Sequence, residues 1–158
     1  MNNFTLTSIG EICSNEKGFY IKLKNEYAPA IEGLDGFGYI QILWWFDKCD
    51  NSEARSKLIV NKPYVKGPET LGVFATRSPE RPNPIALSLS YVTYIDKENG
   101  IIGLAYTDAF DGTPVLDIKP YTPSLDRVEK PIVPNWCAHW PKCIEKSGEF
   151  DWEAEFNF

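Results

Sequence analysis

The sequence is poor in the residues and runs that several large classes of protein require. Its 158 residues include four cysteines, one histidine and one methionine, and no apolar run approaches the roughly 18 residues of a membrane helix. Cysteines this few and this scattered, with no C-x-x-C pair, exclude a disulfide framework, so we expect reduced thiols. The segment Met1–Thr5 has neither the basic start nor the apolar run of a secretory signal. We therefore expect a cytoplasmic protein without a membrane segment.

Common catalytic and metal-binding signatures are also missing. There is no Walker loop, no H-E-x-x-H and no G-x-S-x-G, and Gly33–Gly38 has G-x-x-G-x-G spacing without a preceding strand. The one histidine, His139, lies between Cys137 and Cys143, and these three residues could ligate zinc with Cys49 as a remote fourth ligand. Their spacing is irregular and two tryptophans flank the histidine, so packed structure is the favoured interpretation. We expect no metal.

What the chain does contain is typical of one all-β globular domain, residues 1–158. Apolar residues make up 43% and charged residues 24%, and helical periodicity is nearly absent, whereas period-two alternation recurs between Gly, Pro and Asn. The Asn-Gly pair within Lys97–Gly100 predicts a hairpin turn, and only Asn51–Lys57 favours a helical turn. The expected strands cover residues 19–24, 39–46, 72–75, 87–95, 101–106 and 115–119.

The C-terminal tail, residues 136–158, ends in a pattern of its own. From Phe150 to Phe158, apolar and mostly acidic residues alternate strictly, which predicts a final strand with one apolar face. That strand would cover the core of its own domain. The alternative is a strand exchanged or packed across a dimer, because a terminal apolar strand needs covering.

Charge is unevenly distributed along the chain. The net charge is −6, which alone argues against a nucleic-acid partner, but residues 51–85 carry a net charge of +3. A local basic region lets an acidic protein bind an anionic ligand.

The most unusual segment, residues 72–88, lies partly in this basic region. Three prolines between positions 79 and 84 fix the backbone in an extended, rigid form without strand pairing. Arg77, Arg81 and Asn83 then offer planar donors that suit a carboxylate, a phosphate or an adenine edge. The alternative is structural, with the arginines paired to Asp108 or Asp111.

A second motif runs from Asp108 to Tyr121. Asp111 and the glycine after it predict a tight turn, and the alternation that follows places Asp117 and Lys119 on one face of the next strand. Acidic groups at a strand end suit ribose hydroxyls or an amino cation. The alternative is that the aspartates of the turn cap their own backbone.

These two motifs, GVFATRSP-x-RPNPI and DGTPVLDIKPY, resemble the TsaA/TrmO family, also called YaeB-like, from about Ile9 to about Pro123. Its better-known members are S-adenosylmethionine-dependent methyltransferases that act on N6 of the threonylcarbamoyladenosine beside the tRNA anticodon. The resemblance implies a compact antiparallel β-barrel with few short helical segments, a homodimer, S-adenosyl-L-methionine as cofactor and tRNA as partner.

The resemblance also suggests roles for individual residues. Cofactor-binding residues would be Arg77, Leu87, Thr107, Asp108 and Ala109, together with Asp47-Lys48, which stand where longer members have His-Gln. Candidates for orienting the accepting nitrogen are Asp117, Lys119 and Tyr121, and Arg81 and Asn83 would contact the substrate. If tRNA is the substrate, its phosphates should meet the basic region of residues 51–85, because the other segments are net negative. The residues concerned are Lys57, Lys62 and Lys66, here called the docking lysines, together with Arg55 and Arg81.

Three departures from the family pattern leave other functions open. The stretch Ser14–Gly18 is too short for the Pro-Arg-Gln loop of longer members, Asp47-Lys48 replaces His-Gln, and the tail replaces their C-terminal extension. One alternative is a cofactor-binding regulatory module without tRNA methylation. The other, suggested by the acidic net charge, is a small-molecule methyltransferase.

Overall fold

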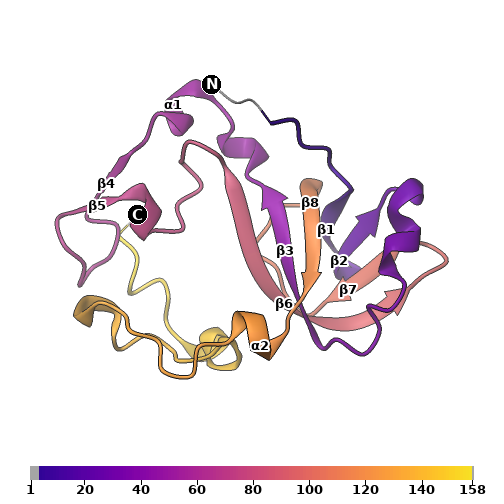
Figure 1. Ribbon diagram of the computed structural model, residues 1–158. Coiled ribbons are helices and arrows are strands. Elements are labelled where there is room, and N and C mark those ends of the chain that lie inside the picture. The colour runs from indigo at the N-terminus through magenta and orange to yellow at the C-terminus, as the bar shows by residue number, and fades with distance from the viewer. Residues whose placement is uncertain (1–3, 158) are drawn as a thin grey trace. The chain divides into compact units, whose positions relative to one another are not determined.

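The computed structural model describes residues 4–157, which form two compact units (Figure 1). One unit combines the chain up to Lys48 with Pro84–Arg127, and we call it the barrel unit. The other combines Cys49–Asn83 with the segment from Val128 onward, and we call it the loop-and-tail unit. Each unit is therefore assembled from two separate stretches of sequence. That residues 1–158 act as a single domain remains a prediction.

Six antiparallel strands of the barrel unit close on themselves in the order β1-β2-β7-β6-β3-β8. The ring closes where β8 pairs with β1, with Ile12 opposite Thr113. The predicted antiparallel β-barrel is thus confirmed. The strands are β1 Gly10–Asn15, β2 Gly18–Leu23, β3 Tyr39–Trp45, β6 Ile85–Asp96, β7 Ile101–Leu104 and β8 Thr113–Pro120. Short helical elements of this unit are η1 Asn25–Ile31 and α2 Pro123–Asp126. The turn η2 Asp47–Cys49 follows β3, where the first stretch of this unit ends.

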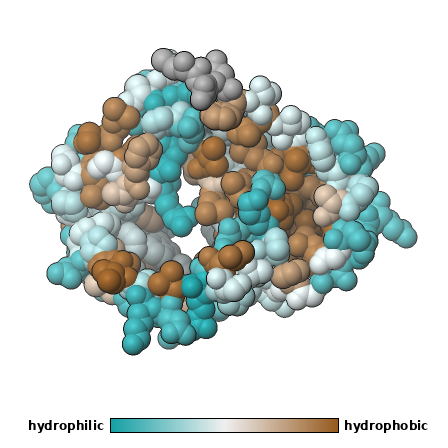
Figure 2. All heavy atoms as spheres, in the orientation of Figure 1, coloured by the Kyte–Doolittle hydropathy of each residue, from teal (hydrophilic) through white to brown (hydrophobic). Residues whose placement is uncertain are grey.

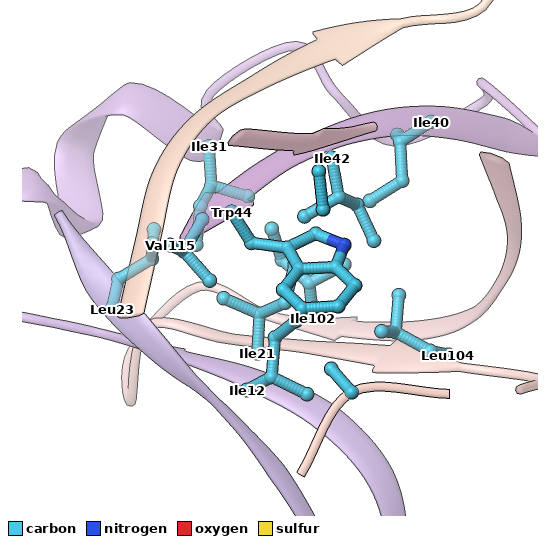
Figure 3. Close-up of a cluster of buried hydrophobic side chains, with 12 residues drawn as sticks. Ile12, Ile21, Leu23, Ile31, Ile40, Ile42, Trp44, Ile102, Leu104 and Val115 are labelled. Atoms are coloured by element: carbon cyan, nitrogen blue, oxygen red, sulfur yellow. The ribbon is translucent and has the colours of Figure 1, made fainter. Parts of the chain in front are cut away.

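The barrel interior is filled mainly by β-branched side chains. Ile12, Ile21, Ile40, Ile42 and Ile102 are completely buried, and Figure 3 shows such side chains converging around the ring of a tryptophan, Trp44. Isoleucine and valine pack well on a pleated surface, which explains why these alternate positions point inward. Full burial of each side chain stabilises the fold by about 1.5–3 kcal/mol.

Strand β6 reverses the usual distribution of residues. Its small residues Ala86 and Ser90 are buried, whereas Leu87 and Tyr91 are 46% and 49% exposed. The indole N–H of Trp44 donates to Ser88 Oγ at 2.9 Å, so the bulky tryptophan occupies the space beside the small residues. The apolar face predicted for this strand is therefore the outer one at Leu87 and Tyr91, whereas Ile95, beyond a register shift, packs against the core. Apolar residues also reach the surface in the space-filling view (Figure 2).

Most of the predicted elements are present with shifted ends. The strands predicted at 19–24, 39–46, 87–95, 101–106 and 115–119 are confirmed, and so is the hairpin, in which Asp96 pairs with Ile101. The strand predicted at 72–75 is wrong. Strand β5 ends at Gly72, and Val73–Ala75 form the 3-10 turn η3 because Thr76 donates both its N–H and its hydroxyl to the Val73 carbonyl.

The loop-and-tail unit has little regular structure. Helix α1 is the helical turn expected from the sequence, and its N-cap Asn51 accepts from the N–H of Ala54 at 2.9 Å. Strands β4 and β5 form a separate two-stranded sheet. The elements are α1 Ser52–Arg55, β4 Ile59–Asn61, β5 Thr70–Gly72, η3 Val73–Ala75, η4 Asn135–Cys137 and η5 Ile144–Glu149.

The described part of the tail does not end in the predicted strand. Trp152 and Phe156 are four residues apart, and their rings are stacked at 5.8 Å, because the Phe156 N–H donates to the Trp152 carbonyl and closes a turn. Only an isolated bridge, between Tyr64 and Phe156, pairs this segment with another. Glu155, expected on a solvent-facing acidic side, is buried. The turn overrides the period-two pattern of the sequence, and Phe158 lies outside the described residues.

Among residues 4–157, no helix has the length and apolar character needed to cross a membrane.

Candidate functional site

The outer face of β6, β3 and β8 brings residues of both sequence motifs together. Strand β3 lies between the other two. Each outward residue of β3 therefore has a cross-strand neighbour in β6 or β8 that is a predicted site residue or lies next to one. Cross-strand neighbours on one face lie about 4.5–5.5 Å apart between Cβ atoms, so each row is continuous. The rows are Leu87–Leu43–Asp117, Leu89–Gln41–Lys119 and Tyr91–Tyr39, and the third continues to Tyr121, whose N–H donates to the Tyr39 carbonyl at 3.0 Å.

Asp117 and Lys119 form an ion pair on this face. Lys119 Nζ lies 2.7 Å from Asp117 Oδ2, while Asp117 Oδ1 accepts from the N–H of Ile118 at 2.9 Å. The hydrogen bond to the Asp117 carboxylate, and then its charge, raise the pKa of Lys119. The shared face predicted from the alternation is confirmed. The pair presents an oriented carboxylate and a permanent cation to solvent.

Tyrosine rings line one end of the same face. The Tyr39 ring lies 5.4 Å from Tyr91 and 6.5 Å from Tyr121, both in edge-on geometry. Tyr121 is half-buried, so the contact with Tyr39 fixes the ring beside the Asp117–Lys119 strand. This arrangement suits a planar ligand better than an extended charged one.

The predicted cofactor segment 107–109 follows β7 and runs along β6. Ser90 Oγ donates to the Tyr106 carbonyl at 2.9 Å, which fastens the start of the segment to the barrel. Thr107 and Ala109 are buried, and Thr107 Oγ1 accepts from the Ala109 N–H at 3.2 Å. Asp108 between them is exposed. Only Asp108 of the three therefore offers its side chain to a ligand.

Asp111 has a structural contact far away in the sequence. Its Oδ1 accepts from the N–H of Ser14 at 2.8 Å, which ties the turn before β8 to the end of β1. The carboxylate of Asp111 thus holds a neighbouring strand, a contact that the hypothesis of a cap on its own turn did not include.

Arg81 is engaged by the backbone of its own segment. Its Nε donates to the Ser78 carbonyl at 2.7 Å, and its Nη2 donates to the carbonyls of Thr76 at 2.7 Å and Val73 at 3.2 Å. These contacts favour a role in holding residues 73–81 over the predicted contact with substrate. Arg77, within this braced segment, is exposed, as is Asn83.

Two of the three docking lysines are already paired with carboxylates. Lys62 Nζ lies 2.7 Å from Glu69, and Lys66 Nζ lies 3.7 Å from Glu155. Lys57 is exposed, and Arg55 contacts Asp50 at 2.6 Å. Phosphate binding by this region would have to compete with these carboxylates, so the docking surface remains a prediction.

The positions where the chain departs from longer family members have compact local structure. Lys48 Nζ lies 3.1 Å from Asp47 Oδ2, so the two residues that replace His-Gln pair with each other. Strands β1 and β2 are joined by two residues, with Asn15 accepting from the Lys17 N–H and Gly18 at a φ of 102°. A glycine suits that left-handed position, and the tight hairpin leaves no room for a functional loop.

Two members of the cysteine and histidine group have partners in the loop-and-tail unit, whereas Cys143 is exposed. His139 Nε2 lies 2.6 Å from Glu155 Oε1, and the Cys137 thiol donates to the Pro134 carbonyl at 3.3 Å. Within residues 4–157, no three His, Cys, Asp or Glu side chains gather closely enough to hold a metal ion.

Sequence reasoning missed the outward residues of β3. Leu43 and Gln41 join the two motifs, yet the run from Tyr39 to Phe46 is so uniformly apolar that its period of two is hidden. The polar Gln41 inside that run was the available signal.

Comparison with known protein families matches residues 9–127 to the tRNA-methyltransferase O N-terminal domain. The chain belongs to this family. It is 39% identical over 110 residues to an S-adenosyl-L-methionine-binding protein of Archaeoglobus fulgidus, covering 70% of this chain and 73% of that protein. It is 42% identical over 98 residues to the tRNA (adenine(37)-N6)-methyltransferase of Escherichia coli, covering 61% of this chain and 41% of the enzyme.

A solved structure shares the fold. The crystal structure of TrmO from Pseudomonas aeruginosa aligns with a TM-score of 0.62 and 29% identity, over 83% of this chain and 62% of that one. The chain thus spans well under two thirds of the Escherichia coli enzyme and just under two thirds of the Pseudomonas protein. The segment beyond residue 127, which includes the tail, lies outside the family match.

Proposed function

We propose that this protein is an S-adenosyl-L-methionine-dependent methyltransferase that methylates N6 of an adenine in tRNA. The observation that carries the proposal is the outer face of the barrel. There Leu43 of β3 lies between Leu87 of the first motif and Asp117 of the second, in a family named for tRNA methylation. The finer substrate proposed is the threonylcarbamoyladenosine beside the anticodon, in a cytoplasmic homodimer.

The exposed residues suit the chemical groups of the cofactor. S-adenosyl-L-methionine carries a carboxylate, an ammonium, ribose hydroxyls and an adenine, and the family motifs offer a partner of each kind. Arg77 provides a guanidinium for the carboxylate, and Asp108 provides an acceptor for the ammonium or the hydroxyls. Leu87 and Leu43 provide an apolar surface for a purine.

The cofactor supplies, when bound, an electrophilic methyl group on a sulfonium. The accepting nitrogen must lie in line with that methyl group, so positioning contributes more than acid–base strength. Lys119, which lies 2.7 Å from Asp117, would orient the carboxylate to accept the proton that leaves the nitrogen. The rings of Tyr39 and Tyr121 would hold a planar base on the same face.

A second function is favoured by the hairpin between β1 and β2 and by the Asp47–Lys48 pair. Both replace parts expected of longer methyltransferases, and the Archaeoglobus relative is named only as a binding protein. A cofactor-binding module without methyl transfer would need neither part. A small-molecule methyltransferase, suggested by the net charge of −6, is the third possibility.

One incubation separates the three functions. Purified protein is mixed with methyl-labelled cofactor and tRNA from a strain that lacks the modification, and cofactor binding is measured in parallel. Labelled tRNA that disappears with Asp117→Asn while cofactor affinity is kept supports the tRNA enzyme. Binding without transfer supports the module, and transfer only to small metabolites supports the third function.

A further inference from the structure

The loop between β4 and β5, residues 62–69, begins with a strained residue. Lys62 has a φ of 38°, in the left-handed region that favours glycine, and it precedes a proline, which restricts the residue before it to extended backbone. Within residues 4–157, no other residue apart from glycine has a positive φ. Strain of this kind clusters at functional sites and persists only where the surrounding structure holds it in place.

The fold gains little from the side chain of this lysine. Lys62 Nζ lies 2.7 Å from Glu69 Oε1, but the two side chains are 42% and 80% exposed. An ion pair so open to solvent contributes little to stability. A glycine would adopt the same backbone without strain, so the requirements of folding favour glycine at this position. A role in binding explains a lysine there.

The tail holds the strained end of the loop in place. The side-chain amide of Asn157 donates to the Lys62 carbonyl at 3.1 Å, and the Asn157 backbone N–H donates to the Pro63 carbonyl at 3.1 Å. Further along the loop, the Val65 N–H donates to the Glu155 carbonyl at 3.0 Å. Both segments belong to the loop-and-tail unit. The backbone of residues 62–65 is therefore fixed by the tail.

Tyr64 anchors the middle of the same loop. Its ring stacks on Trp136 at 5.0 Å with an interplanar angle of 19° and meets Trp140 edge-on at 5.2 Å, and the residue is only 8% exposed. Lys62 and Lys66 lie two residues before and after it, and their side chains are 42% and 60% exposed. The loop thus buries its tyrosine against the tail and leaves both lysines open to solvent.

We propose that this loop and the tail form one phosphate-binding element, in which Lys62 contacts the tRNA backbone and Asn157 is its positioning residue. The inference rests on the proposed function, in which tRNA is the substrate, and it assigns the tail a part in docking. A phosphate suits the element because residues 51–85 carry a net charge of +3, and the exposed pair with Glu69 is weak enough to open for a polyanion. A backbone fixed in advance lowers the entropy cost of the contact.

The first test is Lys62→Gly, which suits the left-handed backbone and removes the side chain. We expect the melting temperature to stay the same or rise, whereas the affinity for fluorescently labelled tRNA should fall. The plot of log affinity against log salt should lose about 0.7–0.9 of its slope, the contribution of one phosphate contact. Lys130→Gly removes an exposed lysine of the same unit outside the loop, so it is the matched control and should keep the slope. A lower melting temperature with an unchanged slope in Lys62→Gly would overturn the binding role.

The second test is Asn157→Ala, which removes an exposed amide and keeps the backbone contact of the tail. We expect the KM for tRNA to rise about 2- to 12-fold, the range for loss of one neutral hydrogen bond, with kcat and cofactor affinity unchanged. In a Lys62→Gly background the same change should have no further effect on tRNA affinity, because Asn157 acts through Lys62.

Binding and methyl transfer are measured separately, so the inference and the proposed function can fail separately. Affinity for tRNA that neither substitution alters overturns the phosphate-binding element, while methylation of tRNA still stands. Affinity that falls as expected in a protein that transfers no methyl group overturns the proposed function and supports the element. A protein that does not bind tRNA at all overturns both.

Discussion

Replacement of Arg81 by alanine should destabilise the loop-and-tail unit. The guanidinium makes two bonds of 2.7 Å and one of 3.2 Å to carbonyl groups, and two of the three accepting residues, Val73 and Thr76, are buried. In Arg81→Ala these carbonyls lose a charged donor.

The magnitude follows from those three distances. A hydrogen bond to a charged group contributes about 1.5–3 kcal/mol, and the half-buried position of Arg81 favours the low end. Two short bonds and one weak one then give about 3 kcal/mol. For a chain of this size each kcal/mol shifts the melting temperature by about 2–4 °C, so a fall of roughly 6–12 °C is expected.

The assay is thermal unfolding, supported by hydrogen exchange at the amides of residues 73–78. Arg81→Lys should lie between the two proteins, because an ammonium keeps the charge but lacks the planar fork. Arg55→Ala is the control, since its contact with Asp50 is exposed and should contribute at most about 1 kcal/mol. If Arg81→Ala unfolds within about 0.5 kcal/mol of the unmodified protein, the carbonyl clamp is not what holds the segment.

Three further predictions concern other parts of the molecule. Gly10→Ala should cost about 1–3 kcal/mol in urea unfolding, because a Cβ there would lie 2.4 Å from the Lys22 carbonyl oxygen; Gly72→Ala, which meets nothing within 4 Å, is the control. Hydrogen bonds from His139, then from Trp140, lower the pKa of the Glu155 carboxyl below its ordinary 4.5. The stabilisation that the ionised carboxylate gives to the folded tail should therefore be lost as the pH falls below 4.5. Glu155→Gln should remove this acid-induced step from the tryptophan fluorescence. Changing all three docking lysines to Glu should abolish tRNA methylation and leave calorimetric cofactor affinity intact; a triple variant that methylates tRNA at the original rate would exclude this surface.

The strands of the barrel could be predicted because each follows a local pattern of alternating residues or ends at a turn signal. Ile21 and Leu23 alternate with lysines, and the Asn-Gly turn sets the register of β6 and β7. The resemblance of two motifs then supplied closure of the sheet, which no local pattern contains. What could not be predicted depends on contacts between distant residues, as when Asp111 binds the Ser14 backbone.

The tail shows why a strict alternation can mislead. Phe150, Trp152 and Phe156 are spaced as in a strand, yet their rings pack on one another. Aromatic pairs of this kind contribute about 0.5–1.5 kcal/mol beyond the burial of their area. The turn at residues 152–156 creates that packing and also buries Glu155, which His139 and Trp140 satisfy. The alternation assigned Glu155 to the solvent-facing side, so it could not predict a buried carboxylate with two donors.

The two family motifs also divide their residues between support and contact. Arg81, Thr107, Ala109 and Asp111 hold backbone or fill the interior. The ligand contacts predicted for the first three stay predictions, and for Asp111 the sequence left a ligand contact and a cap of its own turn both open. The residues left exposed are Arg77, Asp108 and Leu87 in the cofactor set, with Asp117 and Lys119 paired on β8. A rigid backbone lowers the entropy cost of binding. When most residues of a motif serve as support, a few side chains are enough to discriminate between ligands. Substitutions in the supporting residues should therefore change stability and affinity together, whereas those in the exposed residues should change affinity or transfer alone.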